Sequence, residues 1–448
     1  MVLLKNFFNV FKISELKRKL FFTLGILVVY RIGNHIPVIG IDIDKLHQLM
    51  MQTSSVLGGL FAYIDLFSGG SLRQCTIFAL GIAPYITASI MMQMLSMSVP
   101  WLEQLAKEGE YGRKIINQYT RYLALAVSIL QSAVYATVVE NQGLFISPGW
   151  AFRIVFIMSL VVGTMFVVWL SEQISLYGLG SGSSVIIFAG IIARFPEDVL
   201  KTLNAVKEGY ISPLMAFIIF ALVVVIASCI VFLEKGQRKV PVQYSRRVVG
   251  NKIYGGQSTY IPFKINPAGV MPVIMSNAVL NVPLFILSLL ANRIEFLKNF
   301  ASSLTYGGLL YNVVNFVLII FFTFFYTALI FNPDELADNI KKSGGFIPGI
   351  RPGRKTAEFF NYILNRIGLV GALYIAILAV LPSILHVMLS LPFYLSGIMS
   401  GTALLIGVGV ALEIASQIES YLIEHRYEGF LVSGGRLGNR TLYYRGTR

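Results

Sequence analysis

Residues 211–233 read ISPLMAFIIFALVVVIASCIVFL and contain no Asp, Glu, Lys or Arg. A charge at mid-bilayer costs about 2.5 to 3.5 kcal/mol, and a helix needs roughly 20 residues to cross the hydrocarbon core. This stretch therefore predicts a membrane-spanning helix. Long apolar stretches of the same kind predict ten spans in all, at residues 20–40, 74–97, 119–139, 153–172, 183–202, 211–233, 269–291, 307–330, 363–386 and 397–418.

The composition supports an all-α integral membrane protein. Of the 448 residues, 56% are hydrophobic and 13% are charged, and the mean hydropathy is +0.71. A soluble protein averages about 25% charged residues, so a disordered chain and a soluble enzyme are both excluded. The net charge of +14 favours anionic lipid, acidic protein or nucleic acid phosphate as partners outside the bilayer. Cys75, Cys229 and four scattered histidines predict no disulfide framework, metal site or cofactor.

Basic residues set the expected orientation, because they are retained on the cytoplasmic face. Ten spans place both termini on one side, and with the amino terminus inside, the cytoplasmic pieces carry 26 of the 36 Lys and Arg residues. Both termini are therefore expected to be cytoplasmic. Residues 1–19, with Leu4, Phe7, Phe8 and Phe11 at helical spacing beside lysines, predict an amphipathic cytoplasmic segment. Residues 419–448 are expected to form a cytoplasmic tail.

A short apolar segment lies between the first two spans. Residues 56–72, VLGGLFAYIDLFSGGSL, are too few to cross, have glycine pairs at both ends and contain Asp65. Such segments are tolerated at membrane depth only where protein or a cavity surrounds them. We expect a re-entrant segment here, and an external amphipathic loop is the alternative.

Two large cytoplasmic loops are expected at residues 234–268 and 331–360. In the first, QYSRRVVGNKIYGG (243–256) alternates in the manner of a strand around Gly250 and Asn251, which predicts a hairpin that carries Arg246, Arg247 and Lys252. The second, KKSGGFIPGIRPGRKT (341–356), consists of turn residues and basic side chains. Its last four residues resemble the end of a phosphate loop, but the required glycine spacing is absent.

Other functional classes find little support in the sequence. GLGSG (178–182) is not preceded by a strand, so a turn between spans is favoured over a dinucleotide site. There is no HExxH pair and no Ser, His and carboxylate set within the spans, which disfavours an intramembrane enzyme. A secondary transporter of a small solute remains the alternative, because such proteins also use ten spans and broken segments. Arg31, His35 and Glu413 lie in or near spans, but no matched acidic pair accompanies them.

Several long motifs occur in one order along the chain: FSGG (67–70), FALGIAPYITASI (78–90), EGEYGRKIINQYTRYL (108–123), GGQSTYIPFKINPAGVMPVI (255–274) and GGFIPGIRPGRKT (344–356). In these motifs the chain resembles the SecY family, the channel subunit of the bacterial Sec protein translocase. The resemblance implies two inverted five-helix halves, residues 20–202 and 203–418, around a central pore, with 56–72 as a plug. It implies a protein-conducting channel of the cytoplasmic membrane that translocates unfolded secretory polypeptides, releases hydrophobic segments laterally into lipid and performs no covalent chemistry.

The resemblance assigns roles to particular residues. A pore ring falls on six isoleucines: Ile82, Ile86, Ile187, Ile191, Ile274 and Ile406. The first four form two pairs at a spacing of four, which places each pair on one helix face. Any single isoleucine in a span would by default face lipid, so the motif alignment carries this assignment. The plug residues are Gly59, Asp65, Phe67, Ser68, Gly69 and Gly70.

A lateral gate is implied between the second and third spans on one side and the seventh and eighth on the other, with Thr87, Ser89 and Asn277 as polar contacts. Ordinary interhelical hydrogen bonds would explain these residues equally well. Arg246, Arg247 and Lys252 are expected to face the ribosome and its RNA phosphates, and Arg351 the SecA motor. The chain departs from the family at Asn251, where a basic residue is usual, and at Tyr260, where a histidine is common.

The implied partners are the small SecE and SecG membrane subunits, the SecA ATPase, the ribosome, signal peptides, nascent membrane proteins and anionic lipids. We expect energy to come from SecA, from ribosomal synthesis or from the proton motive force.

Overall fold

The computed structural model describes residues 13–41, 68–72, 74–141, 143, 149–209, 212–244, 247–249, 252–254, 258–290, 308–388 and 401–439. Helices form most of this part of the chain, and every predicted span overlaps one of them. The first group of helices comprises α2 (Ser14–Gly33), α5 (Ala83–Ser98), α6 (Pro100–Lys107), α7 (Glu110–Asn141), α8 (Trp150–Tyr177) and α9 (Gly182–Lys207). The second comprises α10 (Pro213–Lys235), α11 (Met271–Leu290), α13 (Leu309–Ile330), α14 (Pro333–Lys342), α15 (Arg354–Met388) and α16 (Gly401–Asn439).

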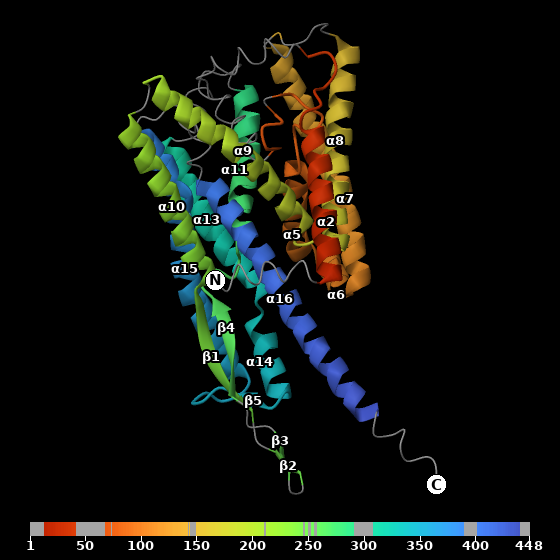
Figure 1. Cartoon of the computed structure of the whole chain (residues 1–448), viewed down its shortest axis with the longest axis vertical. Coiled ribbons are helices and arrows are strands. Elements are labelled where there is room, and N and C mark those ends of the chain that lie inside the picture. The colour runs from red at the N-terminus through yellow and green to blue at the C-terminus, as the bar shows by residue number, and fades with distance from the viewer. Residues whose placement is uncertain are drawn as a thin grey trace.

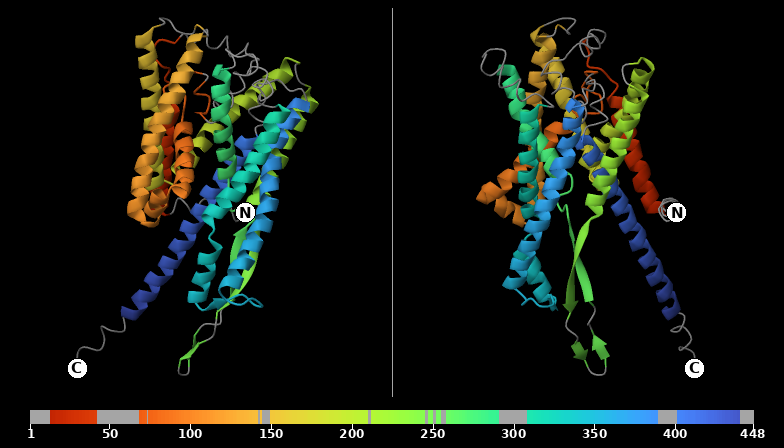
Figure 2. Two further views of the ribbon diagram at one scale, coloured as in Figure 1. Left: turned by 180° about the vertical axis from the view of Figure 1, so that it is seen from behind. Right: turned by 90° about the vertical axis from the view of Figure 1, so that its left-hand side faces the viewer.

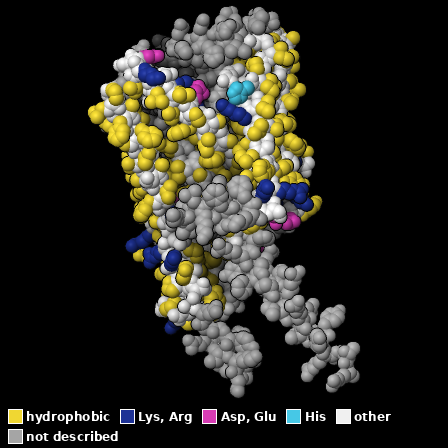
Figure 3. All heavy atoms as spheres, viewed as in Figure 1, with side chains coloured by type: hydrophobic (Ala, Val, Ile, Leu, Met, Phe, Trp, Pro, Cys, Tyr) yellow, Lys and Arg dark blue, Asp and Glu magenta, His cyan; other side chains and the backbone are white. Residues whose placement is uncertain are grey.

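The chain is a multi-pass membrane protein. Five helical stretches within the described residues are long and apolar enough to cross a bilayer: Trp150–Tyr177, Pro213–Lys235, Leu309–Lys342, Arg354–Leu385 and Gly401–Glu424. The helix α10 (213–235) lies within two residues of the predicted span 211–233 at both ends. Hydrophobic side chains cover most of the broad part of the molecule in Figure 3, and Lys and Arg gather along its lower margin.

The second predicted span is helical over only part of its length. The sequence predicted residues 74–97, but α5 begins at Ala83. Gly81 has a φ of +55°, which a right-handed helix does not contain, and Pro84 lies in the first turn of α5, where proline favours helix initiation. Residues 74–82 form successive turns instead, with bonds such as Ala79 N–H to Thr76 O at 3.0 Å.

Other predicted boundaries differ because hydropathy marks only the apolar part of a helix. The helix α15 begins at Arg354 and α16 continues to Asn439, both well beyond the predicted spans. The helix α2 begins at Ser14, so residue 19 is not a helix boundary. The proposed amphipathic residues 4–11 and the turn expected at Leu391, Pro392 and Gly397 lie outside the described residues.

The helices form two groups that lie side by side (Figures 1 and 2). In the first, α5 and α8 pack against α7; in the second, α11 and α15 pack against α13. The groups meet where α9 packs against α16 and where α5 packs against α11. Each group has a hydrophobic core of its own, and a third core contains residues of both.

A small β domain extends from the second group, at the lower end of Figure 1. The strands β1 (Gln237–Tyr244), β4 (Ser258–Lys264) and β5 (Gly345–Phe346) pair antiparallel in the order β4-β1-β5. The sheet packs on α14 and on the first turns of α15 through a core that includes Val242, Phe263 and Phe360. The sequence had predicted only turn residues in the second loop, because β5 is two residues long and its partner strand lies about a hundred positions earlier.

The tip of this domain confirms the predicted hairpin. The strands β2 (Arg247–Val249) and β3 (Lys252–Tyr254) pair antiparallel, with Val249 opposite Lys252. Only Gly250 and Asn251 connect them, as expected for a two-residue hairpin turn.

Candidate functional site: an isoleucine ring with a segment packed against it

The six isoleucines singled out in the sequence lie in one hydrophobic cluster. Ile82, Ile187, Ile274 and Ile406 are at most 9% exposed, and Ile86 and Ile191 pack against them partly buried. The six come from α5 and the residue before it, α9, α11 and α16. Both helix groups therefore contribute to this cluster. We call the six isoleucines the isoleucine ring.

Local structure brings the members of each pair together. The Ile86 N–H donates to the Ile82 carbonyl at 3.1 Å, so these residues are one helical turn apart although Ile82 precedes the helix. Ile187 and Ile191 are one turn apart on α9. Gly407, which follows Ile406, faces α9: a Cβ built there would be in ordinary van der Waals contact with Ile191 Cγ2, at 3.9 Å. A ring of branched aliphatic side chains offers no ligand to an ion and disfavours water.

Residues 68–72 pack directly against the helices that carry the ring. A Cβ built on Gly69, whose φ is +70°, would lie 2.9 Å from Gly190 Cα. A Cβ built on Gly81 would lie 3.6 Å from Ser68 Cα. Gly81 and Gly190 immediately precede Ile82 and Ile191 in the sequence. Ser68 and Gly69 thus lie next to residues that adjoin the ring. Gly70 follows them with a φ of +92° and nothing within 4 Å of a built Cβ, and Gly59, Asp65 and Phe67 lie outside the described residues.

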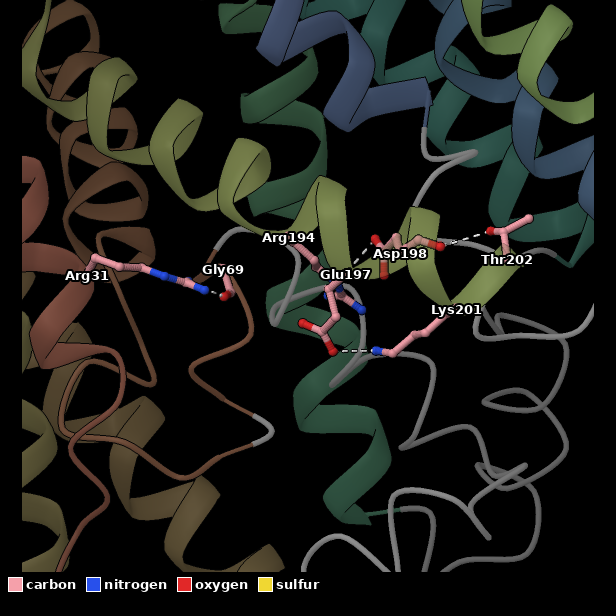
Figure 4. A network of polar contacts seen from close by, with 7 residues as sticks. All are labelled: Arg31, Gly69, Arg194, Glu197, Asp198, Lys201 and Thr202. Atoms are coloured by element: carbon pink, nitrogen blue, oxygen red, sulfur yellow. Dashed lines mark hydrogen bonds and ion pairs between the residues drawn. The ribbon is translucent and has the colours of Figure 1, made fainter. Parts of the chain in front are cut away.

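Polar side chains of α2 and of Asn34, which caps it, contact the same segment, a role that was not predicted from the sequence. Arg31 Nη1 donates to the Gly69 carbonyl at 3.4 Å (Figure 4). The Tyr30 hydroxyl and Asn34 Nδ2 both donate to the Ser68 carbonyl at 3.5 Å. Tyr30 and Asn34 are four residues apart in a predicted span. Two polar groups at that spacing are the sequence feature that could have indicated a contact on this side of the helix.

The helix α9 carries charges just beyond the ring. Arg194 Nε lies 3.5 Å from Asp198 Oδ2, and both side chains are buried. Lys201 pairs with Glu197 at 2.6 Å on a more exposed face of the same helix (Figure 4). Within the described residues, no group of three or more His, Cys, Asp or Glu side chains is arranged to hold a metal ion.

The three gate candidates lie on or near the contact between α5 and α11. Thr87 is buried and donates within its own helix to the Ala83 carbonyl at 3.1 Å, and Ser89 is half-buried. Asn277 on α11 is buried, and neither atom of its amide has a hydrogen-bond partner among the described residues. Apolar side chains fill the contact between α5, α11 and α13: Ile90, Met275 and Phe322. The structure shows no hydrogen bond between Thr87 and Asn277 in this part of the chain.

The basic candidates lie in the β domain and beside it. Arg247 begins β2 and Lys252 begins β3, whereas Arg246 lies outside the described residues. Arg351 is exposed in the turn between β5 and α15, where its carbonyl accepts a bond from Thr356 Oγ1 at 3.0 Å. GLGSG joins α8 to α9, so the expectation of a turn between spans is confirmed.

The arrangement can be compared with known proteins. The sequence profile of the SecY family matches residues 76–415. The chain belongs to the SecY family. It is 43% identical over 428 residues to the protein translocase subunit SecY of Aquifex aeolicus, covering 94% of this chain and 98% of that protein. The corresponding subunit of Thermus thermophilus is 42% identical over 447 residues, covering 98% and 100%. That of Escherichia coli K12 is 43% identical over 425 residues, covering 94% of each.

Solved structures share the fold of this SecY-family chain. A structure described as a protein-conducting channel aligns with a TM-score of 0.61 at 18% identity, covering 90% of this chain and 92% of that one. Sec61 from a canine ribosome-channel complex aligns with a TM-score of 0.58 at 17% identity, again covering 90% and 92%. The chain is therefore a SecY-family protein translocase subunit with the fold of the protein-conducting channel, and the solute-transporter alternative is set aside.

Proposed function

We propose that the isoleucine ring is the constriction of this channel, through which unfolded secretory polypeptides cross the bacterial cytoplasmic membrane. One observation carries the proposal: both helix groups supply the six isoleucines, which form one buried apolar cluster. The six isoleucine side chains have no hydrogen-bonding groups, so they can separate from one another without breaking a hydrogen bond among themselves. An apolar ring refuses ions because their dehydration is costly, while flexible aliphatic side chains can close around an extended polypeptide.

The proposed topology has ten spans in two inverted halves with both termini cytoplasmic. The strongly basic loops at the end of the molecule that carries the β domain support this orientation. Residues 56–72 act as the plug on the outer side of the ring. The surface between α5 and α11, with Thr87, Ser89 and Asn277, acts as the lateral gate.

Selection at the gate is a partition between water and lipid. Each Leu, Ile, Phe or Val at the centre of a segment favours lipid by about 0.3 to 0.6 kcal/mol, and one charge opposes it by about 2.5 to 3.5 kcal/mol. A segment of roughly 20 residues sums these terms and either leaves sideways or passes through.

The channel itself supplies no energy. We propose that SecA, the ribosome or the proton motive force drives transport, and that SecE and SecG are the small membrane partners. The hairpin with Arg246, Arg247 and Lys252 offers basic side chains to ribosomal RNA phosphates, and Arg351 contacts the motor. Signal peptides, nascent membrane proteins and anionic lipids are the remaining partners. The solved Sec61 relative was described in a ribosome-channel complex.

Site-directed crosslinking tests the constriction. Cys75 and Cys229 are first replaced by alanine, and single cysteines are then introduced at Ile82, Ile191 or Ile406. A stalled secretory chain that carries a thiol crosslinker should react at all three ring positions. A cysteine at Val225, which is 60% exposed on α10, is the matched control and should not react. Equal reaction at the control and the ring positions would contradict the proposal.

A further inference from the structure

The end of the segment next to the ring is held from several sides. Gly69 lies so close to α9 that a Cβ built on it would be 2.9 Å from Gly190 Cα, and Ser68 is within van der Waals reach of Gly81 before α5. The helix α2 closes the remaining side with the donors Tyr30, Arg31 and Asn34. Tyr30 and Arg31 lie in the last turn of α2 and Asn34 caps its carboxyl end, so the three donors are grouped at one end of the helix.

The donors act on backbone carbonyls, so this contact does not depend on the side chains of the segment. The Ser68 carbonyl accepts from Tyr30 and Asn34, and also from Ser71 Oγ at 2.7 Å. The Gly69 carbonyl accepts from the charged Arg31. Departure of the segment would take these acceptors away from two donors that are each only 2% exposed. Buried donors without partners are costly, so the contact favours the seated position.

The bonds are nevertheless long, at 3.4 to 3.5 Å, close to the limit at which a hydrogen bond is recognised. Each is therefore weak, and the seated position depends on all of them together. A set of weak bonds holds a segment in place at rest and still gives way to a stronger competitor. An entering polypeptide that displaces the segment therefore meets no single strong bond in this contact.

We propose that Tyr30, Arg31 and Asn34 form a latch, a set of positioning residues that keeps residues 68–70 seated against the isoleucine ring while the channel is closed. The latch rests on the proposed function, because it assigns a cause to the closed state of the same constriction. It releases the segment when a polypeptide enters. Its strength sets how readily the channel opens to a poor signal sequence.

The first test removes the donors while preserving much of the side-chain bulk. A triple variant with Tyr30→Phe, Arg31→Met and Asn34→Ala is reconstituted with its partner subunits in vesicles. Three weak hydrogen bonds together should shift the closed–open equilibrium by about tenfold. We expect a similar rise in ion leak, together with increased export of a preprotein that carries a defective signal sequence. Restoring Arg31, or placing lysine there, should recover part of the seal.

Matched variants separate the outcomes. Tyr177→Phe removes a hydroxyl from a tyrosine that is 61% exposed on the same half, and its leak should equal that of the wild type. Ile406→Asn tests the constriction itself. If Ile406→Asn leaks but the triple variant seals and selects like the wild type, the latch is wrong and the proposed function stands. If neither variant leaks, the proposed constriction fails as well.

If the triple variant does not fold, a second measurement tests whether residue 68 must separate from Asn34 during export. In a chain without Cys75 and Cys229, cysteines at Asn34 and Ser68 are joined by a short, cleavable bifunctional thiol reagent. Crosslinking should stop export while the leak stays low, and cleavage of the reagent should restore export. Normal export through the crosslinked channel would overturn the latch, because residue 68 would then not need to leave α2.

Discussion

The backbone N–H of Gly180 donates to Oε1 of Gln417 at 2.9 Å, which ties the turn between α8 and α9 to the last helix of the chain. Two further hydrogen bonds lie near this one: Leu179 N–H donates to Thr23 Oγ1 at 3.0 Å, and Lys19 Nζ donates to the Tyr421 hydroxyl at 3.0 Å. We call the three bonds together the junction. Around these bonds lies a small apolar cluster that includes Leu16 and Ile418. The junction therefore joins both helix groups, about three turns along α16 from Ile406.

Gln417→Ala should weaken this junction. The substitution leaves the Gly180 amide without its acceptor, so we expect a loss of about 1 kcal/mol in the free energy of unfolding. Thermal unfolding of the purified complex in detergent measures the change. Ser416→Ala, at an exposed neighbouring position, is the control and should stay within about 0.5 kcal/mol of the wild type. Equal stability of the two variants would show that the bond contributes nothing.

Ile406→Asn should wet the ring. Ile406 is fully buried in the cluster, and an amide there supplies a hydrogen-bonding group where the other five isoleucines offer none. We expect increased ion leak and weaker selection against defective signal sequences, both measured in reconstituted vesicles. Ile406→Val keeps the position apolar and should seal normally. Ion leak and selection at wild-type levels in the asparagine variant would place the constriction elsewhere.

Arg351→Glu should separate the two sources of driving force. The side chain is exposed in the turn between β5 and α15, a different segment from the hairpin that carries Arg247 and Lys252. We expect charge reversal to impair motor-driven export more than ribosome-coupled insertion, as measured by parallel assays on the same membranes. Arg354→Glu changes a nearby exposed cation and serves as the control. An equal loss in both assays for Arg351→Glu would reject this division of labour.

The sequence predicts the helices well where composition alone determines them. A run without charges suffices for α10, and the alternation around Gly250 and Asn251 suffices for the hairpin. It predicts less where the partner is distant. The strand β5 forms because Gly345 and Phe346 pair with β1, and no local pattern of two residues encodes that pairing.

The candidate site, like the fold, was predicted from the sequence in part. The motifs point to the six isoleucines, and the structure brings all six into one cluster. Ile82, however, precedes its helix, because Gly81 adopts a positive φ that the hydropathy of the predicted span 74–97 does not reveal. The contacts of Tyr30 and Asn34 were not predicted, because a polar residue in a span does not indicate its partner. The partner here is the Ser68 carbonyl, more than thirty positions later.

Gly371→Ala should strain the contact between α15 and the end of β4. A Cβ built on Gly371 would collide with the Ile265 carbonyl oxygen, whereas one built on Gly368, one turn earlier in the same helix, would meet nothing closer than 3.9 Å. We expect Gly371→Ala to cost about 1 to 3 kcal/mol in the free energy of unfolding. Gly368→Ala should be neutral or should stabilise by up to about 1 kcal/mol, because alanine favours a helix.

The same pair of variants also reports on the ring. Ile265 lies in the chain between β4 and α11, the helix that carries Ile274, so we expect a displaced Ile265 carbonyl to shift the start of α11. Gly371→Ala should therefore raise the ion leak as well as lower the thermal stability in detergent, while Gly368→Ala changes neither for the worse. A strained but fully sealed Gly371→Ala channel would show that the position of α11 is set within the membrane and not by the β domain.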